Sequence, residues 1–338
     1  MCFSFSSCSR RLQDENGIFR GHPEPRQRAS CRVPQTLCPL HSQSCQGRGL
    51  RLLHPDKKNM TLITSPANPR ISKLRDLHTT RGRKKSGLFL MEGPHLLEAL
   101  LDAQIVPQEV YYQPELLQRT ANGRSLLKHL LHTSSLAPEQ LIEVSERVIE
   151  SLGETQTSQG IVGVLSLDAF QPEHVRARRL KAARAALLIL DDLADPGNMG
   201  TILRTALAAD VDEVLLTPGC VDCYSPKVVR AASGAHIALP LALNLSWDAI
   251  AERITLHCKG ERRVFLAEAG SPHLYFEQDL KRPFALIIGN EAHGPSRGAR
   301  SLATLPIAIP LANGVESLNA AMATGIVLFE AIRQARQS

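Results

Sequence analysis

The chain of 338 residues has no apolar run long enough to cross a membrane. A membrane-spanning helix needs about 20 consecutive apolar residues, and no uninterrupted run in this sequence reaches a dozen. The hydrophobic fraction is nevertheless 43%, which suffices for proper cores in a chain of two-domain length. The sequence therefore predicts a globular protein without a membrane partner.

Cysteine is scarce in most of the chain. Five of the eight cysteines precede residue 60, and only Cys220, Cys223 and Cys258 follow it. So few thiols are typical of a reducing compartment, and we expect the protein in the cytoplasm. The spacing of Cys220 and Cys223 would suit a metal or redox pair, but no second cysteine pair or histidine pair completes a zinc site. We predict no metal.

Three common catalytic signatures are missing as well. A nicotinamide dinucleotide fold needs G-x-G-x-x-G directly after its first strand, and the glycine pairs at 197/200 and 289/294 have other spacings. The chain contains no G-K-[ST] phosphate loop and no G-x-S-x-G nucleophile turn. Dinucleotide oxidoreductases, P-loop nucleotidases and α/β-hydrolases therefore have no support in the sequence.

The net charge of +6 is confined to the N-terminal residues. Residues 1–59 carry ten Lys and Arg against four Asp and Glu, which leaves 29 of each sign in the remainder. They have no hydrophobic period and no continuous apolar segment of a secretory signal. We predict a disordered or non-native extension, with the folded protein starting at Met60.

From residue 60 onward, short strands and helices alternate. Residues 60–168 predict a small α/β domain, and the arginine-rich residues 169–184 predict a linker. Residues 185–338 predict a second α/β domain, whose repeated strand, loop and helix units favour a parallel sheet with helices on both faces.

A group of basic residues follows the first predicted helix, at 69–80. Residues 81–87 predict a flexible basic loop, with further cations just upstream. Such a cluster binds RNA phosphates, although a solvated turn would have the same composition. We expect an RNA-contacting surface here, formed by Arg70, Lys73, Arg81, Arg83, Lys84 and Lys85.

Three glycine-bearing segments in the second region each follow an apolar strand, at 198–206, 287–294 and 307–329. We predict a helix at 201–209 after the first strand and a helix at 317–336, capped by Ser317, in the last segment. Backbone N–H groups at such helix starts favour ligands at the carboxyl ends of the strands. A ligand site is therefore expected, although Asn198 and Ser317 could serve only as helix caps.

The three segments read NMGTILRTA at 198–206, IIGNEAHG at 287–294 and IPLANGVESLN at 309–319. In this order they resemble the three motifs of the SpoU (TrmH-type) RNA ribose 2′-O-methyltransferases, of the trefoil-knotted SPOUT class. DCYSPKVVRAASGA, starting at Asp222, also resembles that family, and the likeness covers roughly residues 185–335. Residues 65–165, with FLMEGPHLLEAL and SQGIVGV, resemble the substrate-binding domain attached in many members.

This resemblance implies a fold and a cofactor. The C-terminal domain would contain a deep trefoil knot, and the small domain would be an RNA-binding α/β domain similar to ribosomal protein L30e. The family is homodimeric, and each site is completed by the partner. S-adenosylmethionine would be bound by Gly289, Ile309, Ser317 and Leu318.

The implied reaction is methyl transfer to a ribose 2′-OH, and the additional domain favours large-subunit ribosomal RNA. Transfer RNA remains an alternative, as does a non-catalytic RNA-binding assembly factor of the same fold. Arg204 would orient a phosphate and stabilise a developing alkoxide, because a guanidinium hardly ever deprotonates. The implied catalytic residues are Asn198, Arg204, Glu291, Ser317 and Asn319, with Lys227 and Arg230 as further RNA contacts.

Overall fold

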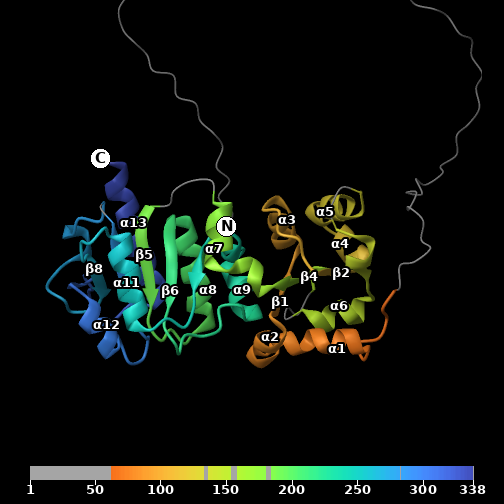
Figure 1. The fold of residues 1–338 in the computed structure, drawn as a ribbon, viewed down its shortest axis with the longest axis horizontal. Helices are drawn as coiled ribbons and strands as arrows, with labels where there is room; N and C mark the ends of the chain where they lie inside the picture. Colours follow the sequence, from red (N-terminus) through yellow and green to blue (C-terminus); the bar gives the residue numbers. More distant parts are fainter. Residues whose placement is uncertain (1–61, 133–135, 154–157, 180–183, 282, 338) are drawn as a thin grey trace, which may run out of the picture. The chain divides into compact units, whose positions relative to one another are not determined.

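The computed structural model describes residues 62–132, 136–153, 158–179, 184–281 and 283–337. Within these ranges the chain forms two β-sheets, each with its own helices (Figure 1). The predicted extension at 1–59 lies outside the described residues, and so does part of the predicted linker. The domain limits stay a prediction, although each of the two predicted α/β regions holds one sheet.

The first sheet is small and mixed, with the strand order β1-β4-β2-β3. Strand β4 (Ile161–Ser166) is antiparallel to β1 (Leu88–Glu92) and to β2 (Glu109–Tyr112), whereas β3 (Leu141–Glu143) runs parallel to β2. Short strands that alternate with helices agree with the α/β fold predicted for this region. The helices of this region are α1 (Pro69–Arg75), α2 (Thr80–Ser86), α3 (Pro94–Asp102), α4 (Pro114–Gln118), α5 (Ala121–His132) and α6 (Glu146–Leu152).

The prediction of a basic loop at 81–87 is wrong, because residues 80–86 form helix α2. The Thr79 hydroxyl accepts a hydrogen bond from the backbone N–H of Gly82 (3.0 Å) and caps the helix start. Gly87 ends the helix in the left-handed conformation (φ 70°). Thr79 also ends the preceding helical stretch, since α1 stops at Arg75 and only a 3₁₀ turn at Asp76–His78 follows.

The second sheet has six parallel strands in the order β10-β8-β9-β5-β6-β7. This confirms the predicted parallel α/β sheet. Its strands are β5 (Arg184–Leu190), β6 (Val211–Leu216), β7 (Leu241–Ala242), β8 (Val264–Ala267), β9 (Phe284–Ile288) and β10 (Leu305–Ile307). Its helices are α7 (Pro172–Arg178), α8 (Pro196–Ala208), α9 (Pro226–Ala232), α10 (Ala235–Ala238), α11 (Trp247–His257), α12 (Arg297–Leu302) and α13 (Ala320–Arg336).

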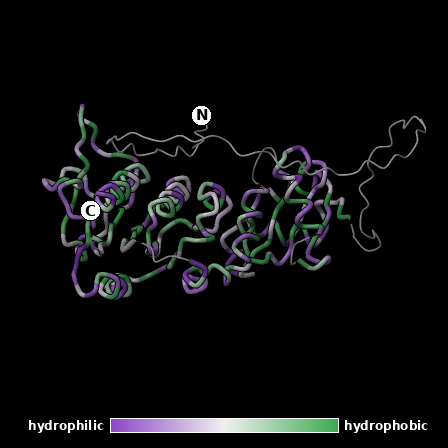
Figure 2. Tube along the Cα trace, turned by 90° about the horizontal axis from the view of Figure 1, so that it is seen from above, coloured by the Kyte–Doolittle hydropathy of each residue, from purple (hydrophilic) through white to green (hydrophobic). Residues whose placement is uncertain are grey.

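Both faces of this sheet are buried, because successive residues of a strand point to opposite sides. In β5, Leu188 and Leu190 join a core that includes residues of α8, α9 and α13. Leu187 and Ile189 join a separate core with α11 and α12. Hydrophilic and hydrophobic residues alternate along the helices (Figure 2). None of the helices in the described ranges has the length and apolar content needed to span a membrane.

Two helices next to the predicted ligand site begin elsewhere than predicted. Helix α8 starts at Pro196 instead of residue 201, because Asp195 accepts a hydrogen bond from the Asn198 N–H (2.6 Å) and proline suits the first helical position. Helix α13 starts at Ala320, and its cap is Asn319, not Ser317. Asn198 is thus inside a helix and caps nothing.

The two sheet regions meet at a buried ion pair. Arg83 of α2 is 2% exposed, and its Nε and Nη2 donate to Oδ2 of Asp222 at 3.0 and 2.6 Å. Its Nη1 donates to the carbonyl of Leu77 (2.7 Å). Beside this pair, the ring of Phe89 contacts those of Phe170 and Tyr224, with centroids 5.1 and 5.0 Å apart. Polar and apolar contacts therefore both join the two regions.

The buried His236 makes folding stability sensitive to acid. Its Nε2 bonds with the carbonyl of Cys223 (2.7 Å), and burial lowers the pKa of His236 from 6.5 to about 4. Because the unfolded chain binds the proton more tightly, we expect the free energy of unfolding to fall by about 3 kcal/mol between pH 6.5 and pH 4. Urea unfolding across this range should show the loss, and His236→Gln should reduce it. An unchanged slope in the variant would contradict the assignment.

Candidate functional site

The three predicted motif segments meet at one edge of the second sheet. Strands β10, β8, β9 and β5 are neighbours and parallel, so their carboxyl ends lie along the same edge. The segments that follow these strands carry Leu311, Glu268, Gly289 and Asn198. In open parallel sheets this edge is the usual place for a ligand.

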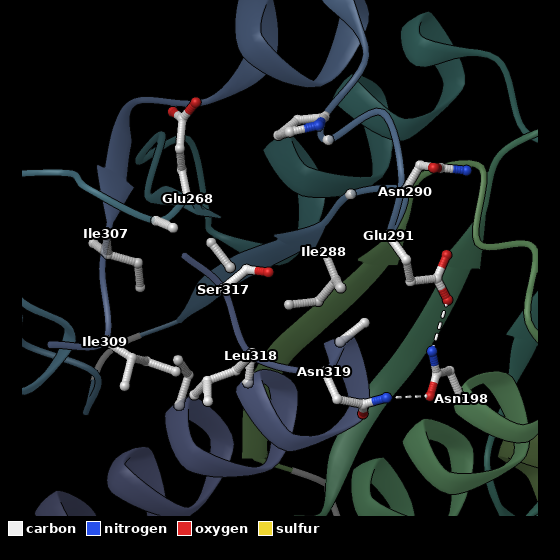
Figure 3. A pocket seen from close by; sticks show the side chains of 18 of the residues that line it. Asn198, Glu268, Ile288, Asn290, Glu291, Ile307, Ile309, Ser317, Leu318 and Asn319 are labelled. Carbon is white, nitrogen blue, oxygen red and sulfur yellow. Dashed lines mark hydrogen bonds between the residues drawn. The ribbon is translucent and has the colours of Figure 1, made fainter. Parts of the chain in front are cut away.

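A cavity of about 540 Å³ lies at this edge (Figure 3). Its volume falls within the range of small-molecule sites. The apolar part of its wall comes from β9, β10, α13 and the segment between β10 and α13, and it includes Ile288, Ile307, Ile309, Leu318 and Val327. Its polar lining residues include Asn198, Glu268, Asn290, Glu291, Arg300, Ser317 and Asn319.

A directional hydrogen-bond chain closes one side of the cavity. Oδ1 of Asn319 caps α13 by accepting from the N–H groups of Ala321 (2.9 Å) and Met322 (3.3 Å). Its Nδ2 is therefore free to donate to Oδ1 of Asn198 (2.8 Å).

With its oxygen engaged, Asn198 donates through Nδ2 to Oε1 of Glu291 (2.8 Å, Figure 3). A carboxylate only accepts hydrogen bonds, so the helix cap at one end and Glu291 at the other fix the orientation of both amides. Three residues far apart in the sequence thus form one rigid polar group.

The loop after β9 is held in a tight turn. Oδ1 of Asn290 accepts from the N–H groups of Ala292 (2.8 Å) and His293 (2.9 Å), and its Nδ2 donates to the carbonyl of Asp192 (2.7 Å). The buried carboxylate of Asp191 accepts from the N–H of Ser296 (2.7 Å). The loop is anchored at both ends to residues that follow β5.

Gly289 is required where this loop folds back. A Cβ there would lie 2.7 Å from the backbone nitrogen of Pro295 and 2.8 Å from its Cα. Gly289→Ala should therefore displace the loop, reduce the free energy of unfolding by about 1–3 kcal/mol and weaken ligand binding in the cavity at least about tenfold. Calorimetric binding and urea unfolding would measure both. An alanine variant with unchanged affinity would show that the loop tolerates the shift.

Seven of the eight predicted catalytic and cofactor residues line the cavity: Asn198, Gly289, Glu291, Ile309, Ser317, Leu318 and Asn319. Arg204 does not line it. This residue lies on the exposed side of α8, one turn beyond Thr201. Ser317 is exposed and caps no helix, so its hydroxyl remains available to a ligand.

Of the eight predicted RNA-binding residues, two form ion pairs with carboxylates of the protein and six are exposed. Arg83 is buried against Asp222, and the structure removes it from the exposed cations. Arg70 is exposed but pairs with Glu109 (2.7 Å). The other six are exposed on α1, α2 and α9: Lys73, Arg81, Lys84, Lys85, Lys227 and Arg230.

The two cysteines with metal-like spacing are free thiols. Burial raises the pKa of Cys220 and of Cys223, and protonated thiols are poor metal ligands. In the described ranges no three His, Cys, Asp or Glu side chains gather in a way that could hold a metal ion.

Several residues of the site were not predicted. Asp191 and Asp195 position the loop after β9 and the start of α8, and Glu268 and Arg300 line the cavity. The Asp195-Pro196 pair carries a recognisable helix-start signal. Glu268 directly follows a strand, a position that had no reason to stand out before the strand order was known.

The chain matches two family profiles. Residues 185–329 match the SpoU rRNA Methylase family, and residues 68–163 match the MRM3-like substrate binding domain.

Three curated proteins show this likeness along most of the chain. An uncharacterized tRNA/rRNA methyltransferase of Synechocystis is 35% identical, with 83% of this chain and 97% of that protein covered. The mitochondrial rRNA methyltransferase 3 of Homo sapiens is 32% identical (80% and 74% covered). The 23S rRNA (guanosine(2553)-2′-O)-methyltransferase RlmP of Bacillus subtilis is also 32% identical (80% and 98% covered).

Two solved structures share the fold. A crystal structure of an RNA 2′-O ribose methyltransferase has a TM-score of 0.66 and 28% identity, with 82% of this chain and all of that chain covered. An AdoMet-bound rRNA methyltransferase from Sinorhizobium meliloti has a TM-score of 0.65 and 28% identity, with 81% and 98% covered. Both matches extend over the two sheet regions together.

Proposed function

The chain belongs to the SpoU rRNA methylase family, and on this basis we propose that it transfers a methyl group from S-adenosylmethionine to a ribose 2′-OH of ribosomal RNA. The observation that carries the proposal is the cavity at the sheet edge, closed on one side by the Asn319–Asn198–Glu291 chain. The same edge holds all three family motifs.

The cavity has the chemistry that the cofactor needs. Ile309, Leu318 and Val327 give an adenine ring apolar walls. Gly289 lines the cavity and has no side chain, which lets the loop fold back onto Pro295 and keeps the backbone of this turn at the cavity wall. We therefore assign adenosine recognition to Gly289, Ile309 and Leu318. When bound, S-adenosylmethionine supplies an electrophilic methyl group on a sulfonium.

The polar residues are assigned to the RNA ribose. A hydroxyl is a weak nucleophile at neutral pH, because it must lose its proton as its oxygen attacks. Asn198 and Asn319, whose amides are fixed by Glu291 and the α13 cap, hold the target sugar in one orientation. Ser317 adds a hydroxyl at the same edge. Arg204 orients the adjacent phosphate and stabilises the developing alkoxide electrostatically.

Two copies of the chain are proposed to act together. Leu318, Met322 and Phe329 are 38%, 61% and 50% exposed, and Met322, Ile326 and Phe329 share one side of α13 by their spacing. An exposed apolar surface of this kind favours association. In a two-fold symmetric dimer this surface of each copy would be buried against the same surface of the other copy. Arg204 lies on α8, which packs against α13, so in the dimer it would serve the partner's cavity.

We also propose the trefoil knot of the SPOUT class. The connection between β8 and β9 is fastened to α13 by Gln334, which accepts from the N–H of Leu280 (2.8 Å) and donates to the carbonyl of Gln278 (2.9 Å). On another side α13 packs on α8. A C-terminal helix held against the chain that joins two earlier strands is what threading through that connection requires.

We propose that RNA phosphates contact two sets of exposed cations. The first set lies on α1 and α2 and the second on α9: Lys73, Arg81, Lys84 and Lys85, and Lys227 and Arg230. Location in the cytoplasm and a small domain similar to ribosomal protein L30e remain our predictions.

The test is incubation with labelled S-adenosylmethionine and total RNA, followed by fractionation of the RNA by size and digestion to nucleosides. Label in a 2′-O-methyl nucleoside from large ribosomal RNA is the expected result. Label in transfer RNA would overturn the substrate, and a chain that binds the cofactor without transferring label would favour an assembly factor.

A further inference from the structure

The cavity has a second polar side, distant from the Asn198–Asn319 pair. Glu268 follows β8 directly, and its backbone N–H donates to the carbonyl of Ile307 (3.0 Å). Its carboxylate accepts a hydrogen bond from Nη1 of Arg300 on α12. Figure 3 places Glu268 across the cavity from Asn198 and Asn319. Neither Glu268 nor Arg300 has a role in the proposed reaction.

Glu268 is the lining carboxylate on the side of the cavity away from the Asn198–Asn319 pair. The charged residues of the lining are Glu268, Glu291 and Arg300. Glu291 accepts through Oε1 from Asn198 on the opposite side of the cavity, and Glu268 accepts through Oε1 from Arg300, which leaves Oε2 of Glu268 for a ligand in the described contacts. A carboxylate offers about four acceptor positions. The Glu268 side chain is 29% exposed and can therefore accept further hydrogen bonds from a bound molecule.

The place of Glu268 in the sheet suggests which groups it would accept from. Strand β8 is the immediate neighbour of β9, and β9 leads into the Gly289 turn. In dinucleotide-binding folds the glycine turn follows one strand, and an acidic residue further along the chain accepts from a ribose hydroxyl. Parallel neighbours lie about 5 Å apart, so a carboxylate at the end of β8 is within reach of a sugar bound at the turn.

We propose that Glu268 accepts hydrogen bonds from the ribose hydroxyls of the adenosyl cofactor, and that Arg300 positions its carboxylate. This inference rests on the proposed function, since it names the group that reads the sugar of the same cofactor. It gives the cavity two ends: Glu268 holds the cofactor's ribose, and the Asn198–Asn319 pair holds the RNA ribose.

The test measures ligand affinity by calorimetry, with S-adenosylhomocysteine and 5′-methylthioadenosine as probes. Both contain the ribose, but only the first has the amino acid. Glu268→Gln should raise Kd for both by a similar factor, about 10- to 100-fold, because a charge-assisted acceptor is lost. Glu277→Gln makes the same charge change at an exposed residue that does not line the cavity, and should leave both affinities unchanged.

A second measurement separates recognition from misfolding. The 2′-deoxy and 3′-deoxy forms of S-adenosylhomocysteine should bind the unaltered chain more weakly than the ribose form. In Glu268→Gln this preference should shrink to within about twofold, since the acceptor is already absent. For Arg300, lysine should retain part of the ribose preference and methionine should lose it.

A variant with weakened S-adenosylhomocysteine binding but unchanged 5′-methylthioadenosine binding would overturn the ribose assignment, and so would a ribose preference that survives in Glu268→Gln. If the unaltered chain bound neither probe, the proposed function itself would fail, and the assignment with it.

Discussion

Arg204→Ala should lower kcat by about 100- to 1000-fold without weakening cofactor binding. Loss of one electrostatic stabiliser of a developing oxyanion typically has an effect of this size. Arg204 is assigned to the RNA phosphate and not to the cofactor, so the Kd for S-adenosylmethionine should stay within about twofold. Because the residue is exposed, the free energy of unfolding should change by less than about 0.5 kcal/mol.

Steady-state kinetics on ribosomal RNA, together with calorimetric cofactor binding, would measure these effects. The kcat of Arg204→Lys should lie between those of Arg204→Ala and the unaltered protein. Lysine keeps the positive charge but loses the bidentate hydrogen-bonding geometry of the guanidinium. Thr201→Ala is the matched control: it lies on the same exposed side of α8, and its hydroxyl only donates to the carbonyl of Gly197. Similar kcat values for Arg204→Ala and Thr201→Ala would refute the assigned role.

Asn319→Asp should lower kcat about 100-fold while leaving the protein nearly as stable. An aspartate oxygen can still cap α13, because Asp and Asn are similar helix caps. The second oxygen, however, would replace a donor with an acceptor 2.8 Å from Oδ1 of Asn198. Asn198 would have to rotate, and its carbonyl oxygen would then face the Glu291 carboxylate. One atom change thus disrupts the whole chain.

Asn319→Ala provides the comparison, because it removes the cap as well as the donor. It should lower kcat similarly and also reduce the free energy of unfolding by about 1 kcal/mol. Urea unfolding and kinetics on both variants would separate the two functions of the side chain. If Asn319→Asp retained full activity, Asn319 would be only a cap.

The parallel sheet and its buried strands could be predicted from the sequence, because short apolar runs separated by helical segments have few other solutions. The position of Asn198 beside Glu291 and Asn319 could not. These residues are separated by 93 and 121 positions, and they meet only because β5, β9, β8 and β10 are adjacent in an order that does not follow the sequence. The motif resemblance supplied what local patterns could not.

The fate of Arg83 illustrates a second limit. Among the consecutive cations of residues 81–85, composition gives no reason to separate one from the others. Once Thr79 starts a helix, the 3.6-residue period directs Arg83 inward while Arg81, Lys84 and Lys85 stay exposed. The prediction of a loop at 81–87 did not include this period, and Arg83 was therefore grouped with its exposed neighbours.

The contact between Arg83 and Asp222 has a consequence for exchanging parts between relatives. The two family profiles divide the chain into a substrate-binding and a methylase portion that could be taken as interchangeable. A substrate-binding portion joined to a partner without an acid at the position of Asp222 would bury a guanidinium with no counter-charge, at a cost of about 3–5 kcal/mol. Chimaeras between relatives should therefore fold stably only if they contain both the arginine of position 83 and an acid at position 222.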